Sequence, residues 1–107
     1  MKLEVHAAVL ADDLPSIYAF IARDNVSAAE RVLEAIRRTF DLITLEPACG
    51  VAYRTRNPLL KELRMFPIGG YPNYLLFYRI GDDAVRVLYA VHGARHLPHL
   101  FRMNPRH

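Results

Sequence analysis

The chain has 107 residues, of which 52% are hydrophobic and 23% charged, proportions that fit a globular domain and exclude a disordered or fibrous segment. A chain of this length sustains one hydrophobic core, so we expect a single domain over residues 1–107. The lone cysteine, Cys49, excludes an intrachain disulfide and is expected to have a structural role.

Charge is distributed unevenly along the chain. Residues 1–50 contain five basic and eight acidic side chains, whereas residues 51–107 contain nine basic and three acidic ones, giving net charges of −3 and +6. Eight of the nine basic residues in the second half are arginines, whose planar guanidinium forms paired hydrogen bonds with carboxylates and phosphates. Charge alone therefore indicates an acidic protein partner, an RNA backbone, or a solvated basic face with no dedicated partner.

The N-terminal segment lacks the features of a signal peptide. Residues 1–14 contain Lys2 as their only basic residue and are interrupted by Asp12 and Asp13. No stretch approaches the roughly twenty apolar residues that span a bilayer. We therefore expect a cytoplasmic protein that does not bind a membrane.

Alternating apolar and polar side chains predict a first strand over residues 2–9. Asp12 and Asp13 offer carboxylates that can cap a helix, and Pro15 is tolerated in a first helical turn, so a helix is expected to begin there and to end near Arg23. Its apolar stripe has three- and four-residue spacing and comprises Leu14, Ile17, Tyr18 and Ile21.

A second helix is predicted to begin after Asp24 and Asn25, which signal a turn and a cap, and to end before Pro47, which forbids continuation. Its apolar face comprises Ala29, Val32, Leu33, Ile36, Phe40 and Ile43. Two helices joined by so short a link form an antiparallel hairpin, and each apolar stripe must be buried against another element.

The rest of the sequence predicts strands. They are expected at residues 51–53, 62–68, 74–80 and 84–92, with Pro67 at an edge or at a strand end. A turn at residues 81–83 joins the last two strands into a hairpin. The segment 97–101 is expected to form a final turn, and the tail 102–107 is expected to fray.

The last strand has apolar residues on both faces. Strict alternation puts Val85, Val87, Tyr89 and Val91 on one face, and Arg86, Leu88, Ala90 and His92 on the other. A partly apolar second face indicates a central strand or a face covered by a partner. The predicted element order is β-α-α-β-β-β, with one further strand at the end if all the predicted strands form. This order predicts an α+β domain in which a helical hairpin packs on a small antiparallel β-sheet.

The sequence resembles ParE-like toxins of the RelE/ParE superfamily, which belong to type II toxin–antitoxin systems. In the helical hairpin the resemblance lies in Asp13–Leu14, Ile17–Tyr18, Ile21–Ala22, Asp24–Asn25 and Ala28–Ala29. Further along it lies in Leu45–Pro47, Gly50, Leu63–Arg64, Tyr71–Tyr74, Leu76–Arg79 and Val87–Arg95. These stretches follow the family in order and spacing over about residues 12–98, and they imply the fold predicted above.

The resemblance implies a toxin that inhibits DNA gyrase by protein binding and is neutralised by a ParD-like antitoxin. It implies no cofactor, no catalytic residues, and DNA contact only through the antitoxin complex. An acidic, disordered antitoxin segment is expected to fold as a helix on the hairpin and to add extended chain near a sheet edge. The expected antitoxin-binding residues are Tyr18, Leu33, Arg37, Arg64 and Arg79, and the expected target-binding residues are Arg95, His99 and Arg102.

The alternative function is that of a RelE-type ribosome-dependent mRNA endonuclease. Its candidate catalytic residues are Arg64, Arg79, His92 and Arg95. Phe101 and its neighbour Leu100 stand where the RelE pattern has a tyrosine, and neither can transfer a proton, which argues against cleavage. A third hypothesis is a non-toxic family member that only binds an antitoxin.

Three histidines near the C-terminus, His92, His96 and His99, suggest a zinc site by their spacing. Gly93 and Pro98 interrupt the helix that would align them, and no thiolate or carboxylate completes the set. We therefore expect no metal.

Overall fold

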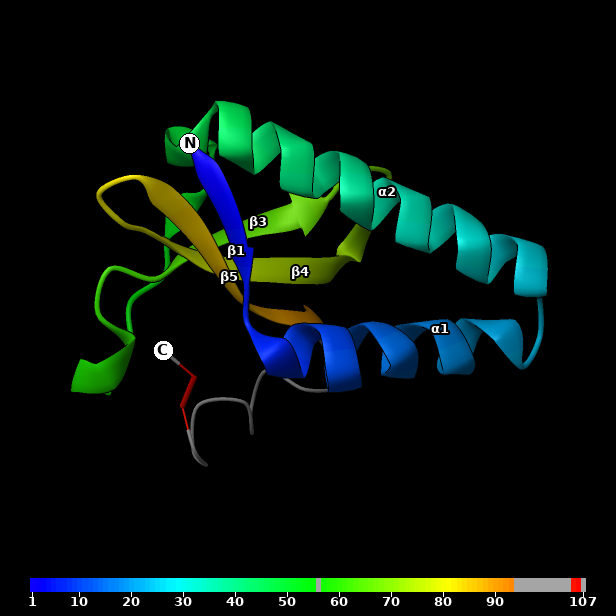
Figure 1. The fold of residues 1–107 in the computed structure, drawn as a ribbon. Coiled ribbons are helices and arrows are strands. Elements are labelled where there is room, and N and C mark those ends of the chain that lie inside the picture. The colour runs from blue at the N-terminus through cyan, green and yellow to red at the C-terminus, as the bar shows by residue number, and fades with distance from the viewer. Residues whose placement is uncertain (56, 94–104, 107) are drawn as a thin grey trace.

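The computed structural model of the protein describes residues 1–55, 57–93 and 105–106, apart from the side chain of Leu59. The elements follow the order β-α-α-β-β-β-β, so the predicted α+β fold class and element order are confirmed (Figure 1). They are β1 (Lys2–Val5), α1 (Leu14–Ala22), α2 (Val26–Leu45), β2 (Val51–Ala52), β3 (Arg64–Ile68), β4 (Tyr71–Ile80) and β5 (Ala84–His92). Among the described residues, no helix is both long and apolar enough to cross a membrane.

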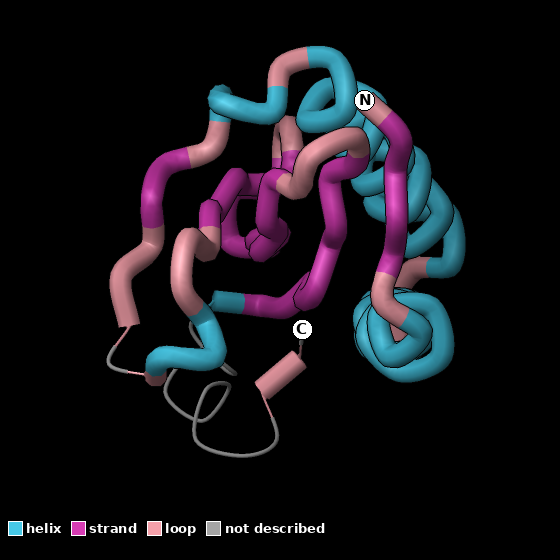
Figure 2. Tube along the Cα trace, turned by 60° about the vertical axis from the view of Figure 1, so that its left-hand side comes forward, coloured by secondary structure: helices cyan, strands magenta, loops and turns pink. Residues whose placement is uncertain are grey.

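The helical hairpin lies on one face of a five-stranded sheet with the order β1-β5-β4-β3-β2 (Figures 1 and 2). Strands β2 to β5 pair antiparallel, but β1 pairs parallel to β5. The sheet is therefore mixed, whereas an antiparallel sheet was predicted. A tight turn forces antiparallel pairing, whereas a long crossover permits a parallel pair. In the sequence, the whole hairpin of α1 and α2 lies between β1 and the other strands, and this long connection allows β1 to pair parallel to β5.

The first helix begins earlier than predicted. Helical backbone starts at Ala7, so the first strand ends sooner, and the turn Val9–Asp13 is π-helical. Asp12 and Asp13 therefore lie within the helix, and the Asp13 side chain forms no capping hydrogen bond. In an α-helix the ring of Pro15 would clash with the carbonyl four residues earlier, and a π-helical turn before it relieves that clash.

The second helix matches its prediction closely. The Asn25 side-chain oxygen accepts a hydrogen bond from the Ala28 amide at 3.0 Å, and the helix ends two residues before Pro47. Its buried face comprises Ala29, Val32, Ala35, Ile36, Thr39, Phe40 and Ile43. Leu33 is only partly buried, because it lies at the side of this face toward α1.

The sheet has an apolar cluster on each face. The cluster away from the helices comprises Leu60, Leu63, Phe77, Leu88, Tyr89 and Val91. The register between β4 and β5 shifts at Tyr78, which marks a β-bulge in β5. The strict alternation predicted for β5 is therefore wrong: Val85 and Val87 pack toward the helices, whereas Tyr89 and Val91 pack on the opposite face.

A buried tyrosine ties the segment after α2 to the sheet. The Tyr78 hydroxyl donates to the Pro47 carbonyl at 2.6 Å and accepts from the Gly50 amide at 2.9 Å. Burial raises the pKa of Tyr78, so its hydroxyl stays protonated and able to donate. Arg64 adds a hydrogen bond of 2.7 Å to the Gly50 carbonyl, so two side chains hold the connection into β2.

Candidate functional site

The helical hairpin contains an apolar groove of about 480 Å³ between its two helices. Its walls come from α1, from the turn before α1, and from α2, and its lining residues are Leu10, Leu14, Pro15, Tyr18, Leu33, Ile36, Arg37 and Phe40. Leu10 is 57% exposed and adds apolar surface to this groove. The structure brings Tyr18, Leu33 and Arg37, three of the expected antitoxin-binding residues, together in this hairpin groove.

Charged side chains form the rim of the hairpin groove on α2. The Arg37 guanidinium contacts the carboxylates of Glu34 at 2.6 Å and Asp41 at 3.3 Å. The hydrogen bond to Arg37 lowers the pKa of Glu34, and the same contact raises the pKa of Arg37, so both groups remain charged. An apolar floor with a charged rim has the chemistry that accommodates an amphipathic helix.

Arg64 and Arg79 lie outside the hairpin groove. Arg64 bonds to the Gly50 carbonyl, and the Nε of Arg79 donates to the Lys61 carbonyl at 3.0 Å on the other face of the sheet. Each guanidinium thus holds a main-chain segment to the sheet. These contacts agree with a structural role for both arginines.

The described candidates for nuclease catalysis do not converge. Arg79 pairs across the β4–β5 hairpin with Arg86, whereas His92 pairs with Tyr74 at its other end. Arg79 lies five positions after Tyr74 along β4, which is about 17 Å at the usual rise of a strand. A general base and its partners must lie within hydrogen-bond reach of one substrate.

The three residues expected to bind the target, Arg95, His99 and Arg102, lie outside the described residues. The same holds for His96 of the histidine set. Across residues 1–55, 57–93 and 105–106, no group of three His, Cys, Asp or Glu side chains is placed to hold a metal ion.

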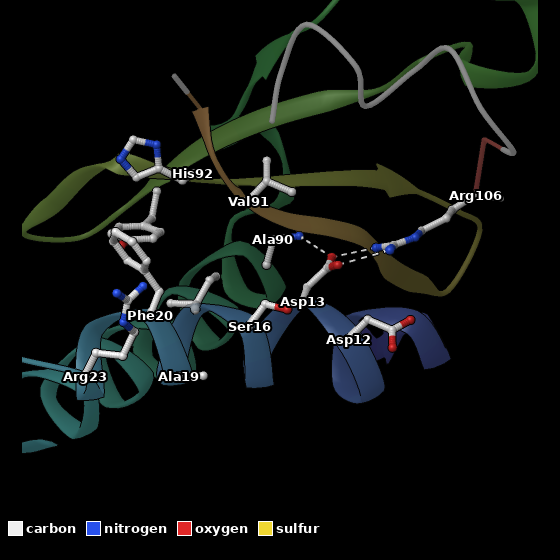
Figure 3. A pocket seen from close by; sticks show the side chains of 12 residues that line it. Asp12, Asp13, Ser16, Ala19, Phe20, Arg23, Ala90, Val91, His92 and Arg106 are labelled. Carbon is white, nitrogen blue, oxygen red and sulfur yellow. Dashed lines mark hydrogen bonds and ion pairs between the residues drawn. The ribbon is translucent and has the colours of Figure 1, made fainter. Parts of the chain in front are cut away.

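A second cleft, of about 670 Å³, lies on the other flank of α1, between that helix and β5 (Figure 3). Its lining residues are Asp12, Asp13, Ser16, Ile17, Ala19, Phe20, Arg23, Tyr74, Ala90, Val91, His92 and Arg106. This α1–β5 cleft was not predicted from the sequence. The available signal was Phe20, an aromatic residue outside the predicted stripe of α1, which is 44% exposed.

A partly buried ion pair closes one end of the α1–β5 cleft (Figure 3). The Arg106 guanidinium contacts both oxygens of Asp13, at 2.5 and 3.0 Å, and donates to the Leu88 carbonyl at 3.0 Å. It also lies 4.7 Å from the centre of the Tyr89 ring. The side chains of Arg106 and Asp13 are only 18% and 10% exposed, respectively. The fraying expected for residues 102–107 therefore does not extend to Arg106.

The position of this ion pair follows from where β1 ends. β1 pairs with β5 only as far as Val87, so within the described part of the chain the next residues of β5 have no neighbouring strand on that side. The Asp13 carboxylate accepts from the Ala90 amide at 3.0 Å, and Arg106 bonds to the Leu88 carbonyl. Side chains thus satisfy backbone groups that a longer β1 would have paired.

Comparisons with known proteins agree with this fold. The sequence matches the family model of the ParE toxin of type II toxin-antitoxin system, parDE, over residues 6–97. Among solved structures, ten chains match, and one of them belongs to the "Chromosomal ParDE TA system from P. aeruginosa". It has a TM-score of 0.68 and 15% sequence identity, and the match covers 86% of this chain and 95% of that chain. No curated protein matches the sequence.

Proposed function

Because this chain belongs to the ParE toxin family of type II toxin–antitoxin systems, we propose that it acts by binding two proteins. The first is a ParD-like antitoxin, which neutralises it. The second is DNA gyrase, which it inhibits. Both partners act in the cytoplasm, and the complex contacts DNA through the antitoxin.

The hairpin groove is the observation that supports the antitoxin as a partner. Leu14, Ile36 and Phe40 line it with apolar surface, and Tyr18 adds an aromatic ring. A helix with apolar residues at three- and four-residue spacing fits such a surface, and its polar face can reach the charges around Arg37. A helix that folds only on binding loses conformational entropy, which this apolar contact must offset.

The dispersal of Arg64, Arg79 and His92 supports protein binding over RNA cleavage. Arg64 and Arg79 bond to backbone carbonyls on opposite faces of the sheet. Phosphodiester cleavage needs cations and a proton-transfer group around one phosphate. The nuclease remains the alternative function, and its catalytic set would require Arg95.

We expect Leu33→Asp to weaken antitoxin binding about 30-fold, because a desolvated carboxylate in the groove costs about 2 kcal/mol. Val26→Asp is the matched control, since Val26 starts the same helix, is 53% exposed and lies outside the groove. Titration calorimetry with the co-encoded ParD-like antitoxin measures both dissociation constants. Equal affinity of the two variants would refute binding in the hairpin groove.

Expression without antitoxin should filament cells and induce the DNA-damage response, because trapped gyrase blocks replication while translation continues. A ribosome-dependent nuclease would instead stop protein synthesis within minutes. Microscopy and pulse-labelling of new protein distinguish the two results. Messages cut in the ribosomal A site would establish the alternative and exclude gyrase as the main target.

A further inference from the structure

Strand β1 forms one edge of the sheet, and among the described residues only β5 pairs with it (Figure 2). The amides of Lys2 and His6 each donate at 2.9 Å to a main-chain carbonyl on the β5 side. Alternate residues of a parallel pair bond to the neighbouring strand, so the amides and carbonyls of Leu3 and Val5 point to the outer edge. An outer edge of this kind can pair with another strand.

The outer edge of β1 differs from the edge of β5 beyond Val87. There the Asp13 carboxylate already accepts from the Ala90 amide, whereas no described side chain bonds to the main chain of Leu3 or Val5. The first three residues of β1 are also exposed. A second strand can therefore reach these main-chain groups without displacing a side chain of the described residues.

The side chains of Lys2 and Glu4 make β1 complementary to a second copy of itself. Both point to the sheet face away from the helices, since they alternate with Leu3, which lies beside the helix-facing Val85. When two copies of β1 pair antiparallel about a two-fold axis at Leu3, Lys2 of each copy lies directly opposite Glu4 of the other. These two residues form a pair without main-chain hydrogen bonds, the type that brings opposed side chains closest.

The same charges select one register. The outward-pointing residues of both copies stay opposite one another in only a few registers. The next register in one direction sets Glu4 against Glu4 of the second copy, and the next in the other direction sets Lys2 against Lys2. Like charges directly opposite one another are destabilising. The pairing centred on Leu3 is therefore the favoured one.

Apolar side chains lie on the other face of the same pairing. In this register Leu3 lies opposite Leu3 of the second copy, and Met1 lies opposite Val5. Leu3 and Met1 are 38% and 52% exposed in the single chain. Pairing of two copies thus removes exposed apolar surface from water, which favours association.

We infer that β1 binds β1 of a second copy of this chain, which joins the two sheets across a two-fold axis. Main-chain hydrogen bonds link Leu3 to its counterpart and Val5 to Met1, and ion pairs link Lys2 to Glu4. The contact is much smaller than a permanent interface, so the dimer is weak and forms as the concentration rises. It involves neither the antitoxin nor the target, so the inference does not depend on the proposed function.

Sedimentation velocity of the purified full chain, without an N-terminal tag, tests the inference over about 5–500 μM, a range that covers weak association. We expect the average mass to rise from that of a monomer toward that of a dimer. Lys2→Glu and Glu4→Lys should each raise the dissociation constant at least about tenfold, because each opposes like charges in both symmetry-related pairs. Arg38→Glu, a charge reversal on the exposed side of α2, should leave it unchanged.

An equimolar mixture of Lys2→Glu and Glu4→Lys isolates the contact between the two copies. A mixed dimer again sets a glutamate opposite a lysine in both pairs. The contacts of Lys2 with Asp83 and of Glu4 with Arg86 within each chain are not restored in the mixture. We therefore expect the mixture to associate at least about tenfold more tightly than either variant alone.

Leu3→Pro tests the main-chain hydrogen bonds. Proline removes the outward amide of this residue but no hydrogen bond to β5, so circular dichroism should show an intact fold while the dimer is lost. The charge variants decide the question if this variant does not fold. A chain that stays monomeric to about 500 μM, a mixture that associates no better than its components, or a dimer that Lys2→Glu leaves unchanged would each overturn the inference.

Discussion

Asp13→Ala should lower the free energy of unfolding by about 3 kcal/mol, the lower end of the range for fully buried ion pairs, because it leaves a partly buried guanidinium without its counter-charge. Arg106 is 18% exposed, and two of its contacts are to the Asp13 carboxylate. The Ala90 amide loses its acceptor in the same variant, which adds to the cost. Urea unfolding followed by circular dichroism measures the change.

Asp12→Ala is the matched control for this prediction. Asp12 is the adjacent carboxylate in the same π-helical turn, but it is exposed, so its removal should change stability by no more than about 0.5 kcal/mol. A double-mutant cycle with Arg106→Ala isolates the coupling between Asp13 and Arg106. A coupling near zero, or equal losses for Asp12→Ala and Asp13→Ala, would contradict an ion pair that anchors the C-terminal end.

Asp13 also shows where reasoning from sequence reaches its limit. An Asp-Asp pair shortly before a proline has the local pattern of a helix cap, and that interpretation was wrong. The true partner, Arg106, is 93 residues away in the sequence. No periodicity or propensity relates two residues at that separation, so the closed end of the α1–β5 cleft could not be predicted.

Local signals predicted other elements well. Asn25 and Pro47 mark the two ends of α2 as predicted, because a helix cap and a helix breaker act on their immediate neighbours. The limits of β5 also match, but the faces of its last residues do not, since one bulge at Leu88 reverses the alternation from Tyr89 onward. Tyr18, Leu33 and Arg37 line one groove, because the predicted hairpin puts both helices side by side, and antitoxin binding by these residues stays a prediction.

Gly50→Ala should destabilise the chain by about 2–3 kcal/mol through steric overlap. A Cβ at this position would overlap the Tyr78 hydroxyl and lie 2.9 Å from Cε1 of the ring. Tyr78 is fully buried and cannot move aside without losing its bonds to Pro47 and Gly50. The Gly50 backbone has φ −74° and ψ 153°, which any residue adopts, so the cost is one of space and not of conformation.

Gly69→Ala is the control for Gly50→Ala, because its nearest neighbour, Thr39 Oγ1, would lie at an ordinary 3.9 Å from the added Cβ. It should leave stability unchanged or raise it by up to about 1 kcal/mol, since alanine restricts the unfolded chain.

Tyr78→Phe removes the overlapping hydroxyl but also two hydrogen bonds, so alone it should destabilise. Combined with Gly50→Ala, it should cost clearly less than the sum of the two single changes, because the added methyl group then fills the space of the lost oxygen. Purely additive losses in chemical unfolding would show that the Tyr78 hydroxyl does not set the close approach at Gly50.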